Sequence, residues 1–281
     1  MTASVHSHTD IVSRGDGDSA AAIGAAIERL ERAYRTRRPC PPVRDLLGAD
    51  NVAAAYAVQR RRVEARTAGG ARIVGRKIGL TAPVVQRQLG VDQPDSGVLL
   101  DDMRLAEGST VAAGRLLQPK VEAEIAFILG TDLDGATDLR TIRAAVHHAV
   151  AAIEIVDSRI ADWDITIADT VADNASCGLF VLGDRQVSLD DIDPVAATMA
   201  LYVDDEQVSS GTGAECLGDP LIALQWLART AQEFGDPLRS GQIILSGALG
   251  PMVVAEPGRR VCAEVSGLGR VTVRFGEGDE R

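Results

Sequence analysis

Three acidic residues stand inside apolar runs of the sequence, where an isolated charge is costly to bury. Glu122 and Glu124 lie two residues apart within 117–129, and Glu154 is the only charge within 149–156. A spacing of two separates side chains by about 200° on a helix but puts them on the same side of a strand. Because Pro119 and the Val, Ile and Phe residues nearby favour a strand, we expect both carboxylates on one face.

Carboxylates gathered on one apolar face need protons or a cation to neutralise them. Three of them suit a hard divalent cation, and Mg²⁺ binds a few carboxylates while retaining water molecules that a substrate can displace. Two other interpretations stay open from the residues alone: each glutamate pairs with an arginine, or the strands lie at a sheet edge with a solvated face. The Glu-x-Glu pattern is common and does not by itself decide among the three.

Two further polar residues have neighbours that permit chemistry. Lys77 lies in an apolar segment between glycines, so its ammonium either reaches outward to solvent or is held in a pocket. Asp95 lies in a Pro-Asp-Ser-Gly sequence, which is more typical of a turn than of a catalytic site. The sequence contains no Walker A loop, no Gly-x-Ser-x-Gly elbow and no His-Glu-x-x-His metal motif.

The elements that would position these residues follow from the hydrophobic pattern. Apolar residues about four apart predict helices over 20–37 and 50–66, and 72–80 has the composition of a strand. Beyond residue 98, the pattern predicts strands at 117–129, 149–156, 178–183, 199–203, 242–254 and 261–275, with helices at 138–148 and 219–234. We therefore predict an α+β fold with a disordered tail (1–19), an N-terminal helical region (20–97), a β-rich catalytic region (98–275) and a frayed C-terminus (276–281).

The composition argues against several classes of protein. The 281 residues are 46% hydrophobic and 25% charged, which is typical of a globular protein of one or two domains. A net charge of −11 opposes binding to nucleic acid and to anionic membranes, and 3% aromatic residues leave few platforms for base stacking. Four widely spaced cysteines and the lack of a signal peptide or an apolar run of membrane-spanning length lead us to expect a reduced, cytoplasmic protein.

Several longer motifs resemble one known family. They are 75–81 (GRKIGLT), 88–95 (QLGVDQPD), 117–124 (LQPKVEAE), 169–178 (DTVADNASCG), 209–218 (SSGTGAECLG) and 245–253 (LSGALGPMV). Together they resemble the 2-keto-4-pentenoate hydratases, in the hydratase/decarboxylase group of the fumarylacetoacetate hydrolase superfamily. The resemblance runs from about residue 25 to 275, which is nearly the whole chain.

The resemblance implies a fold and a set of functional residues. The fold would be the superfamily's mixed β-roll with flanking helices and a small helical N-terminal region. Mg²⁺ or Mn²⁺ would be held by Glu122, Glu124 and Glu154, while Lys77 and Asp95 match positions for acid/base work. Ser176 matches a position near the substrate. Asp157 departs from the family pattern, which has a glycine at this position. Its carboxylate would lie either near the site or only at the end of a strand.

The implied activity is addition of water to 2-hydroxypenta-2,4-dienoate, giving 4-hydroxy-2-oxopentanoate through a metal-chelated enolate, in meta-cleavage degradation of aromatic compounds. One alternative is a decarboxylase of 2-oxo-3-hexenedioate, although the run 247–253 resembles the hydratase branch. Another is a non-catalytic partner subunit, against which the intact glutamates and Lys77 argue. The resemblance also implies a homo-oligomer. A further expectation is a complex with the next enzyme of the pathway, an aldolase, or with a sister decarboxylase.

Overall fold

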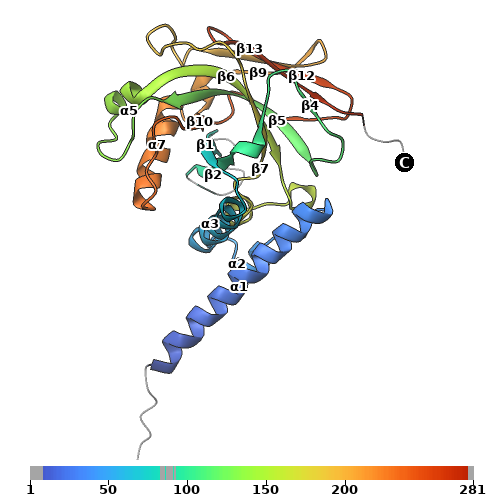
Figure 1. The fold of residues 1–281 in the computed structure, drawn as a ribbon, viewed down its shortest axis with the longest axis vertical. Coiled ribbons are helices and arrows are strands. Elements are labelled where there is room, and N and C mark those ends of the chain that lie inside the picture. Colours follow the sequence, from blue (N-terminus) through green and yellow to red (C-terminus); the bar gives the residue numbers. More distant parts are fainter. Residues whose placement is uncertain (1–8, 83–85, 87–90, 92, 278–281) are drawn as a thin grey trace, which may run out of the picture.

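The computed structural model describes residues 9–82, 86, 91 and 93–277. Three helices open the chain below a strand-rich body (Figure 1): α1 (Thr9–Thr36), α2 (Arg44–Leu47) and α3 (Val52–Ala68). The predicted helices at 20–37 and 50–66 are thus confirmed, but α1 already begins at Thr9, so it takes up part of the predicted tail, whose residues 1–8 lie outside the described ones. No apolar periodicity marks residues 9–19, which is why the sequence pattern missed this extension.

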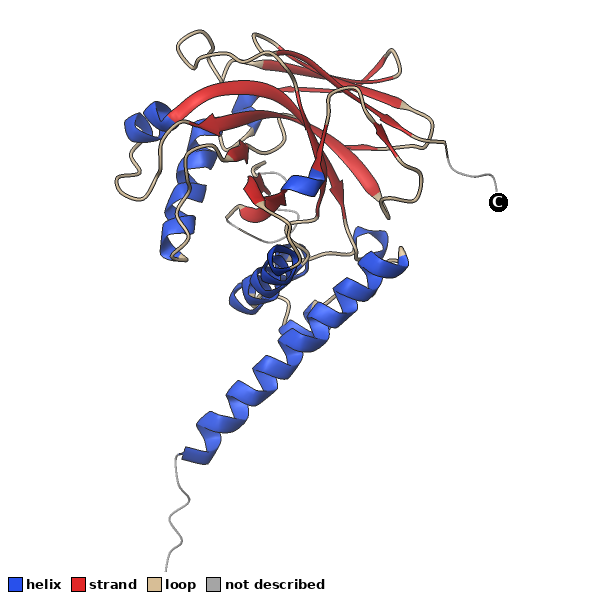
Figure 2. Cartoon of the chain, in the orientation of Figure 1, coloured by secondary structure: helices blue, strands red, loops and turns tan. Residues whose placement is uncertain are grey.

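Eight strands of the described chain form one curved, mixed sheet in the order β2-β1-β10-β5-β6-β7-β3, with β11 paired to β5 (Figure 2). Their bounds are β1 (Ile73–Gly79), β2 (Asp95–Leu100), β3 (Arg104–Leu105), β5 (Pro119–Leu129), β6 (Val146–Asp157), β7 (Cys177–Leu182), β10 (Ile243–Leu245) and β11 (Val253–Val254). Strands β1 and β2 belong to this sheet: β1 confirms the strand predicted at 72–80, whereas β2 begins at Asp95, within the sequence that suggested a turn.

Five strands of the described chain form a second sheet in the order β4-β13-β12-β8-β9. They are β4 (Thr110–Val111), β8 (Thr198–Val203), β9 (Glu206–Thr212), β12 (Arg260–Val265) and β13 (Gly269–Phe275). Helices α5 (Leu139–Ala145), α6 (Ile167–Ala172) and α7 (Pro220–Glu233) complete the body. Helix α5 ends before the predicted 148, because the β-branched Val146 and the residues after it enter β6.

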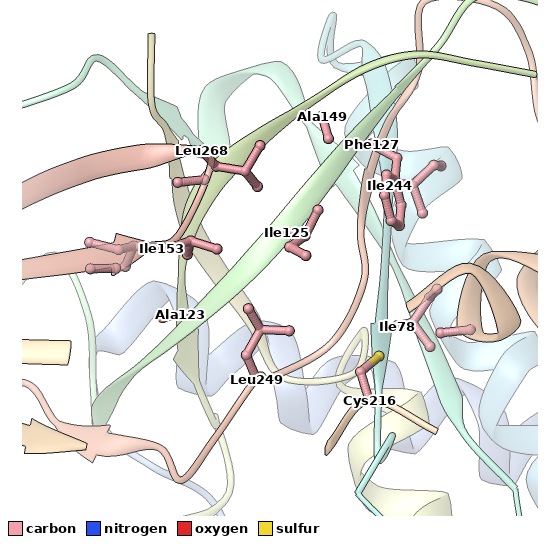
Figure 3. Packing of buried hydrophobic residues seen from close by; sticks show 14 of the residues in the cluster. Ile78, Ala123, Ile125, Phe127, Ala149, Ile153, Cys216, Ile244, Leu249 and Leu268 are labelled. Carbon is pink, nitrogen blue, oxygen red and sulfur yellow. The ribbon is translucent and has the colours of Figure 1, made fainter. Parts of the chain in front are cut away.

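Strands β5 and β6 are buried on both faces, which explains their nearly continuous apolar sequence. One face carries Ile125 and Phe127 of β5 and Ile153 of β6 into the large core that also includes residues of the second sheet (Figure 3). The opposite face carries Glu122, Glu124 and Glu154. The period of two therefore directs the apolar set to the core and the three acids to the opposite face of the sheet.

The predicted α+β fold is confirmed. The curved sheet closes into a roll through hydrogen bonds from one side chain, and not through a further pair of strands. The backbone N–H of Val98 on β2 donates to Asn174 Oδ1 at 2.8 Å, and Asn174 Nδ2 donates to Val98 O at 2.9 Å. The asparagine amide thus copies a strand's pattern of donor and acceptor and joins β2 to the turn that precedes β7. Among the described helices, none combines the length and the apolar character needed to cross a membrane.

Candidate metal centre and active site

The three predicted metal ligands converge. Glu122 on β5 is the direct cross-strand partner of Glu154 on β6, and Glu124 lies two residues further along the same face. One carboxylate oxygen from each lies within 4.8 Å of the others. Glu124 and Glu154 are fully buried, and Glu124 Oε1 and Glu154 Oε2 accept no hydrogen bond from the protein. Buried carboxylate oxygens without donors are the ligands that a divalent cation requires, so the residues fit such an ion.

Electrostatics support the same conclusion. Burial, reinforced by repulsion from Glu154, raises the pKa of Glu122 to about 7. Burial and the two neighbouring carboxylates also hold the pKa of Glu124 well above its usual range. Burial raises the pKa of Glu154 as well, although the Lys77 ammonium opposes it. A cluster that resists ionisation on its own gains most from a cation that neutralises all three acids at once.

Lys77 reaches the carboxylate cluster from β1. Its Nζ lies 3.3 Å from Glu154 Oε1, and its side chain is 5% exposed. Burial by itself would lower the pKa of Lys77, but the neighbouring acidic groups, with Glu154 contributing most, together outweigh that effect and raise the pKa. The pocket interpretation of this lysine is therefore confirmed over the solvent-directed one, and the side chain remains an ammonium ion able to donate a proton.

Asp95 begins strand β2 and does not lie in the turn that its sequence suggested. It pairs with Gly79 on β1, where a Cβ atom would overlap the Asp95 carboxylate, so the glycine is what allows the acid to turn inward. Thr170 Oγ1 donates to Asp95 Oδ2 at 3.2 Å, whereas Oδ1 has no hydrogen-bond partner. Burial raises the pKa of Asp95 against the opposing pull of Lys77. The carboxyl group is thus prepared to exchange a proton.

Ser176 ends an unusual left-handed turn. Asn174, Ala175 and Ser176 have φ angles of 57°, 50° and 54°, a region that non-glycine residues rarely occupy. The hydrogen bonds that Asn174 makes to Val98 hold this turn in place. The Ser176 hydroxyl is buried and has no partner in the protein. Strain that ends in an unsatisfied polar group is typical of a site that binds a ligand.

One cavity of about 250 Å³ unites these groups. Its lining includes Lys77, Asp95, Glu122 and Ser176, and its apolar part comes from residues such as Leu80, Val156, Trp163, Ile165, Ala248 and Met252. A hollow of about 260 Å³ between α3 and α7 is similar in size but, within the described residues, contains no trio of converging acids. The first cavity is therefore the candidate active site.

Of the two expectations for Asp157, the structure supports the strand end, because the residue is the last of β6. Asp157 Oδ1 accepts hydrogen bonds from the backbone N–H groups of Leu117 and Gln118, at 2.8 and 2.7 Å. Its other oxygen lies 4.0 Å from Arg159 Nη1. The residue anchors the chain at the entry to β5 and is not part of the cavity lining.

Sequence reasoning missed two residues of the cavity. Thr170, which orients Asp95, gave no signal in the sequence because its partner lies 75 residues away. Lys120 lines the cavity two residues before Glu122 on the same strand. The alternation that singled out Glu122 and Glu124 extends to Lys120 and could have revealed it.

Comparison with known proteins agrees with this geometry. The model of the fumarylacetoacetate (FAA) hydrolase C-terminal family matches residues 83–275. The chain belongs to the fumarylacetoacetate hydrolase family. Within that family it is 53% identical over 253 residues to 2-keto-4-pentenoate hydratase 2 of Dechloromonas aromatica (strain RCB), covering 89% of this chain and 96% of the relative. It is 41% identical over 253 residues to 2-hydroxyhexa-2,4-dienoate hydratase of Comamonas testosteroni, with the same coverage.

A solved member of the family is also similar in structure. The 4-oxalocrotonate decarboxylase from Pseudomonas putida G7, complexed with magnesium and adipate, superposes with a TM-score of 0.86 at 32% identity, covering 90% of this chain and 97% of that one. The expected membership among hydratases, which are hydro-lyases, is confirmed by the identities to named hydratases. The acidic cluster and the metal-bound family member together support the use of a divalent metal ion.

Proposed function

We propose that this family member adds water to 2-hydroxypenta-2,4-dienoate, or to a homologue with a longer tail, and forms the corresponding 4-hydroxy-2-oxoacid. The observation that carries the proposal is the convergence of three buried glutamates beside Lys77, in a chain 53% identical to a 2-keto-4-pentenoate hydratase. The apolar part of the cavity suits the hydrocarbon end of such a substrate.

Glu122, Glu124 and Glu154 would hold Mg²⁺ or Mn²⁺, since both are hard cations that prefer carboxylate oxygens. When bound, the ion supplies Lewis-acid polarisation to the carboxylate and 2-oxygen of a 2-oxoacid. The protein's part is to hold the three carboxylates close together in a buried place, where a cation would neutralise them. Gly247 assists, because its backbone N–H donates to Glu124 Oε2 at 2.9 Å and fixes that carboxylate.

Lys77 and Asp95 would move the protons. Lys77 Nζ, kept as an ammonium by Glu154, donates a proton to a substrate carbon, and Asp95 Oδ1, which has no other partner, accepts a proton from the attacking water. Two protons reach carbon, one at C5 and one at C3. One of them comes from the 2-hydroxyl as the enol becomes a ketone, and the other comes from the water whose hydroxyl bonds to C4, so the sum is the addition of H₂O. Ser176 would donate its free hydroxyl hydrogen to a substrate oxygen.

The test is turnover of 2-hydroxypenta-2,4-dienoate with Mg²⁺, followed by loss of the dienoate absorbance. We expect Lys77→Ala and Asp95→Ala each to lower kcat by about 100-fold or more, because each removes a positioned proton carrier. Arg140→Ala, an exposed change on α5, serves as the control and should leave kcat unchanged. Near-normal turnover by both cavity variants would contradict the assignment.

The decarboxylase alternative is separated in the same assay with 2-oxo-3-hexenedioate. The similarity to a decarboxylase structure makes this comparison necessary. Release of CO₂ at a rate above that of dienoate hydration would show that the chain is a decarboxylase.

A second experiment tests the metal ligands. We expect Glu124→Gln to weaken Mn²⁺ binding, measured by calorimetry without substrate. Unchanged Mn²⁺ affinity would remove Glu124 from the ligand set.

We also propose that the protein is a cytoplasmic homo-oligomer. The four cysteines are buried and unpaired, which is compatible with a reducing compartment, and the hydratase family resemblance implies self-association. Light scattering coupled to size-exclusion chromatography tests the second point, and a single mass near 29.6 kDa would refute it.

A further inference from the structure

The use of lysine in this chain is very uneven. Of the 29 basic residues, 27 are arginine, and the only two lysines are Lys77 and Lys120. Both line the same cavity of about 250 Å³. Arginine serves every other cationic position, on the surface and in ion pairs alike, so these two positions share a requirement that arginine does not meet. A compact ammonium on a flexible stem is the property that distinguishes lysine from the planar, forked guanidinium.

Lys120 lies on β5 with its side chain on the same face as Glu122 and Glu124. In contrast to Lys77, which is tied to Glu154, its ammonium forms no ion pair or hydrogen bond with the part of the chain that the structure describes. Its Nζ rests instead over the ring of Trp163, 4.4 Å from the centroid. Lys120 is therefore a cation of the cavity that has no carboxylate partner among the described residues.

The ring under Lys120 is held by a strained backbone. Asp162 and Trp163 have φ angles of 58° and 57°, both in the left-handed region. Gln118 fixes this turn, because its backbone oxygen accepts from Trp163 Nε1 at 3.1 Å and its Oε1 accepts from the Asp162 N–H at 2.8 Å. Two consecutive unfavourable residues, held by the residue that immediately precedes β5, indicate a built position for the indole.

We propose that Lys120 binds the carboxylate of the 2-oxoacid or 2-hydroxydienoate substrate, and that Trp163 is the resting place of its ammonium when the substrate is absent. This inference rests on the proposed function. An anionic substrate must enter a cavity that already contains Asp95 and Glu122, with two further glutamates behind, so an unclaimed cation lowers the electrostatic cost of entry. A cation–π contact at a cavity wall is weaker than a charge-assisted hydrogen bond, so the ammonium passes from the ring to the arriving carboxylate.

The substrate carboxylate that Lys120 binds also affects specificity. If Lys120 binds the carboxylate next to the 2-oxygen, the described lining has no other cation without an ion-pair partner that could bind a second carboxylate at the other end of the substrate. The lining is otherwise largely apolar, with residues such as Leu80, Ile165 and Met252. This arrangement selects a substrate with one carboxylate and a hydrocarbon tail.

Binding of an unreactive probe tests the proposal without turnover. Trp163 and Trp226 are the two tryptophans of the chain, so the Trp226→Phe protein reports on the ring beneath Lys120 alone. The Mg²⁺-loaded protein is titrated with 2-oxopentanoate, followed by tryptophan fluorescence, in the parent and in Lys120→Met, Lys120→Arg and Arg140→Met. The last variant removes an exposed charge far from the cavity and controls for net charge.

We expect Lys120→Met to weaken 2-oxopentanoate binding by roughly 10- to 100-fold, the usual effect of losing a hydrogen bond to a charged group. Lys120→Arg should stay within about fivefold of the parent because it keeps the charge, and Arg140→Met should bind normally. In the dienoate assay, Lys120→Met should raise KM with kcat little changed. Normal 2-oxopentanoate affinity in Lys120→Met, or equal weakening in Lys120→Arg, would overturn the proposal.

A diacid probe separates the two ends of the ligand. Lys120→Met should weaken 2-oxohexanedioate and 2-oxopentanoate to the same degree, whereas weakening of the diacid alone would place Lys120 at the far carboxylate and overturn the proposal. If the parent protein fails to hydrate the dienoate while 2-oxopentanoate binding still depends on Lys120, the proposed function fails and the role of Lys120 in carboxylate binding stands.

Discussion

Replacing Glu122 by glutamine should stabilise the metal-free protein near neutral pH. The three glutamates of the cluster lie within 4.8 Å of one another, and no cation but Lys77 approaches them within ion-pair distance in the described residues. Without a metal ion, the charge on Glu122 is therefore unfavourable to the folded state. Glutamine keeps the shape of the side chain and removes that charge.

The size of the effect follows from the pKa. Burial and Glu154 raise the pKa of Glu122 from 4.5 to about 7, so between these pH values the folded state binds more protons than the unfolded state. The free energy of unfolding consequently falls as the pH rises through this window, and the loss is complete above it. The full difference corresponds to about 3 kcal/mol. Because the Glu122 side chain is only half-buried, solvent screening reduces the expected effect to about 2 kcal/mol.

Urea unfolding in EDTA, followed by circular dichroism, measures this difference. At about pH 7.5, Glu122→Gln should be more stable than the wild type by about 2 kcal/mol, and near pH 5 most of that gain should disappear. Glu215→Gln, at an exposed position, is the matched control and should show no such pH dependence. With saturating Mg²⁺ the order should reverse, because only the wild type keeps its full set of ligands. A gain that is the same at both pH values, or absent at pH 7.5, would refute the reasoning.

Three further substitutions test the geometry of the site. Gly79→Ala puts a methyl group where the Asp95 carboxylate lies and should lower kcat about tenfold or more, whereas Gly135→Ala, with open space around it, should not; equal kcat values would contradict this. Asn174→Ala removes both hydrogen bonds that close the roll and should lower the free energy of unfolding in urea by about 2 kcal/mol; a change below about 0.5 kcal/mol would show that the roll closes without them. Ser176→Ala removes a hydroxyl that has no protein partner, so stability should change by less than about 0.5 kcal/mol while KM rises about fivefold, and a clear loss of stability would indicate a structural role.

Local patterns were sufficient for most elements of the fold. The period-two alternation around Glu122 and Glu124 predicted β5, and the helical hydrophobic pattern predicted α3 and α7. The position of Asp95 was predicted wrongly. This residue was expected in a turn, because Pro-Asp-Ser-Gly has local turn propensity, but it begins strand β2. Pairing with β1, 16 residues earlier at Gly79, overrides that propensity, and such pairing cannot be read from a short window.

The sequence by itself determined which residue types were unusual in their surroundings: three acids and a lysine within apolar strands, and motifs shared with one hydratase family. It also determined that Glu122 and Glu124 share a face, because side-chain direction along a strand depends only on spacing. The tertiary structure decided which residues meet. The cross-strand register sets Glu154 opposite Glu122, the curvature of the sheet brings Lys77 to Glu154, and the left-handed turn at 174–176 leaves the Ser176 hydroxyl without a partner. It also turned Asp157 away from the cavity to hold the entry to β5. The physical reason is that spacing fixes the face on which a side chain lies, whereas its partner depends on strand order and register, which are set by contacts between distant parts of the chain.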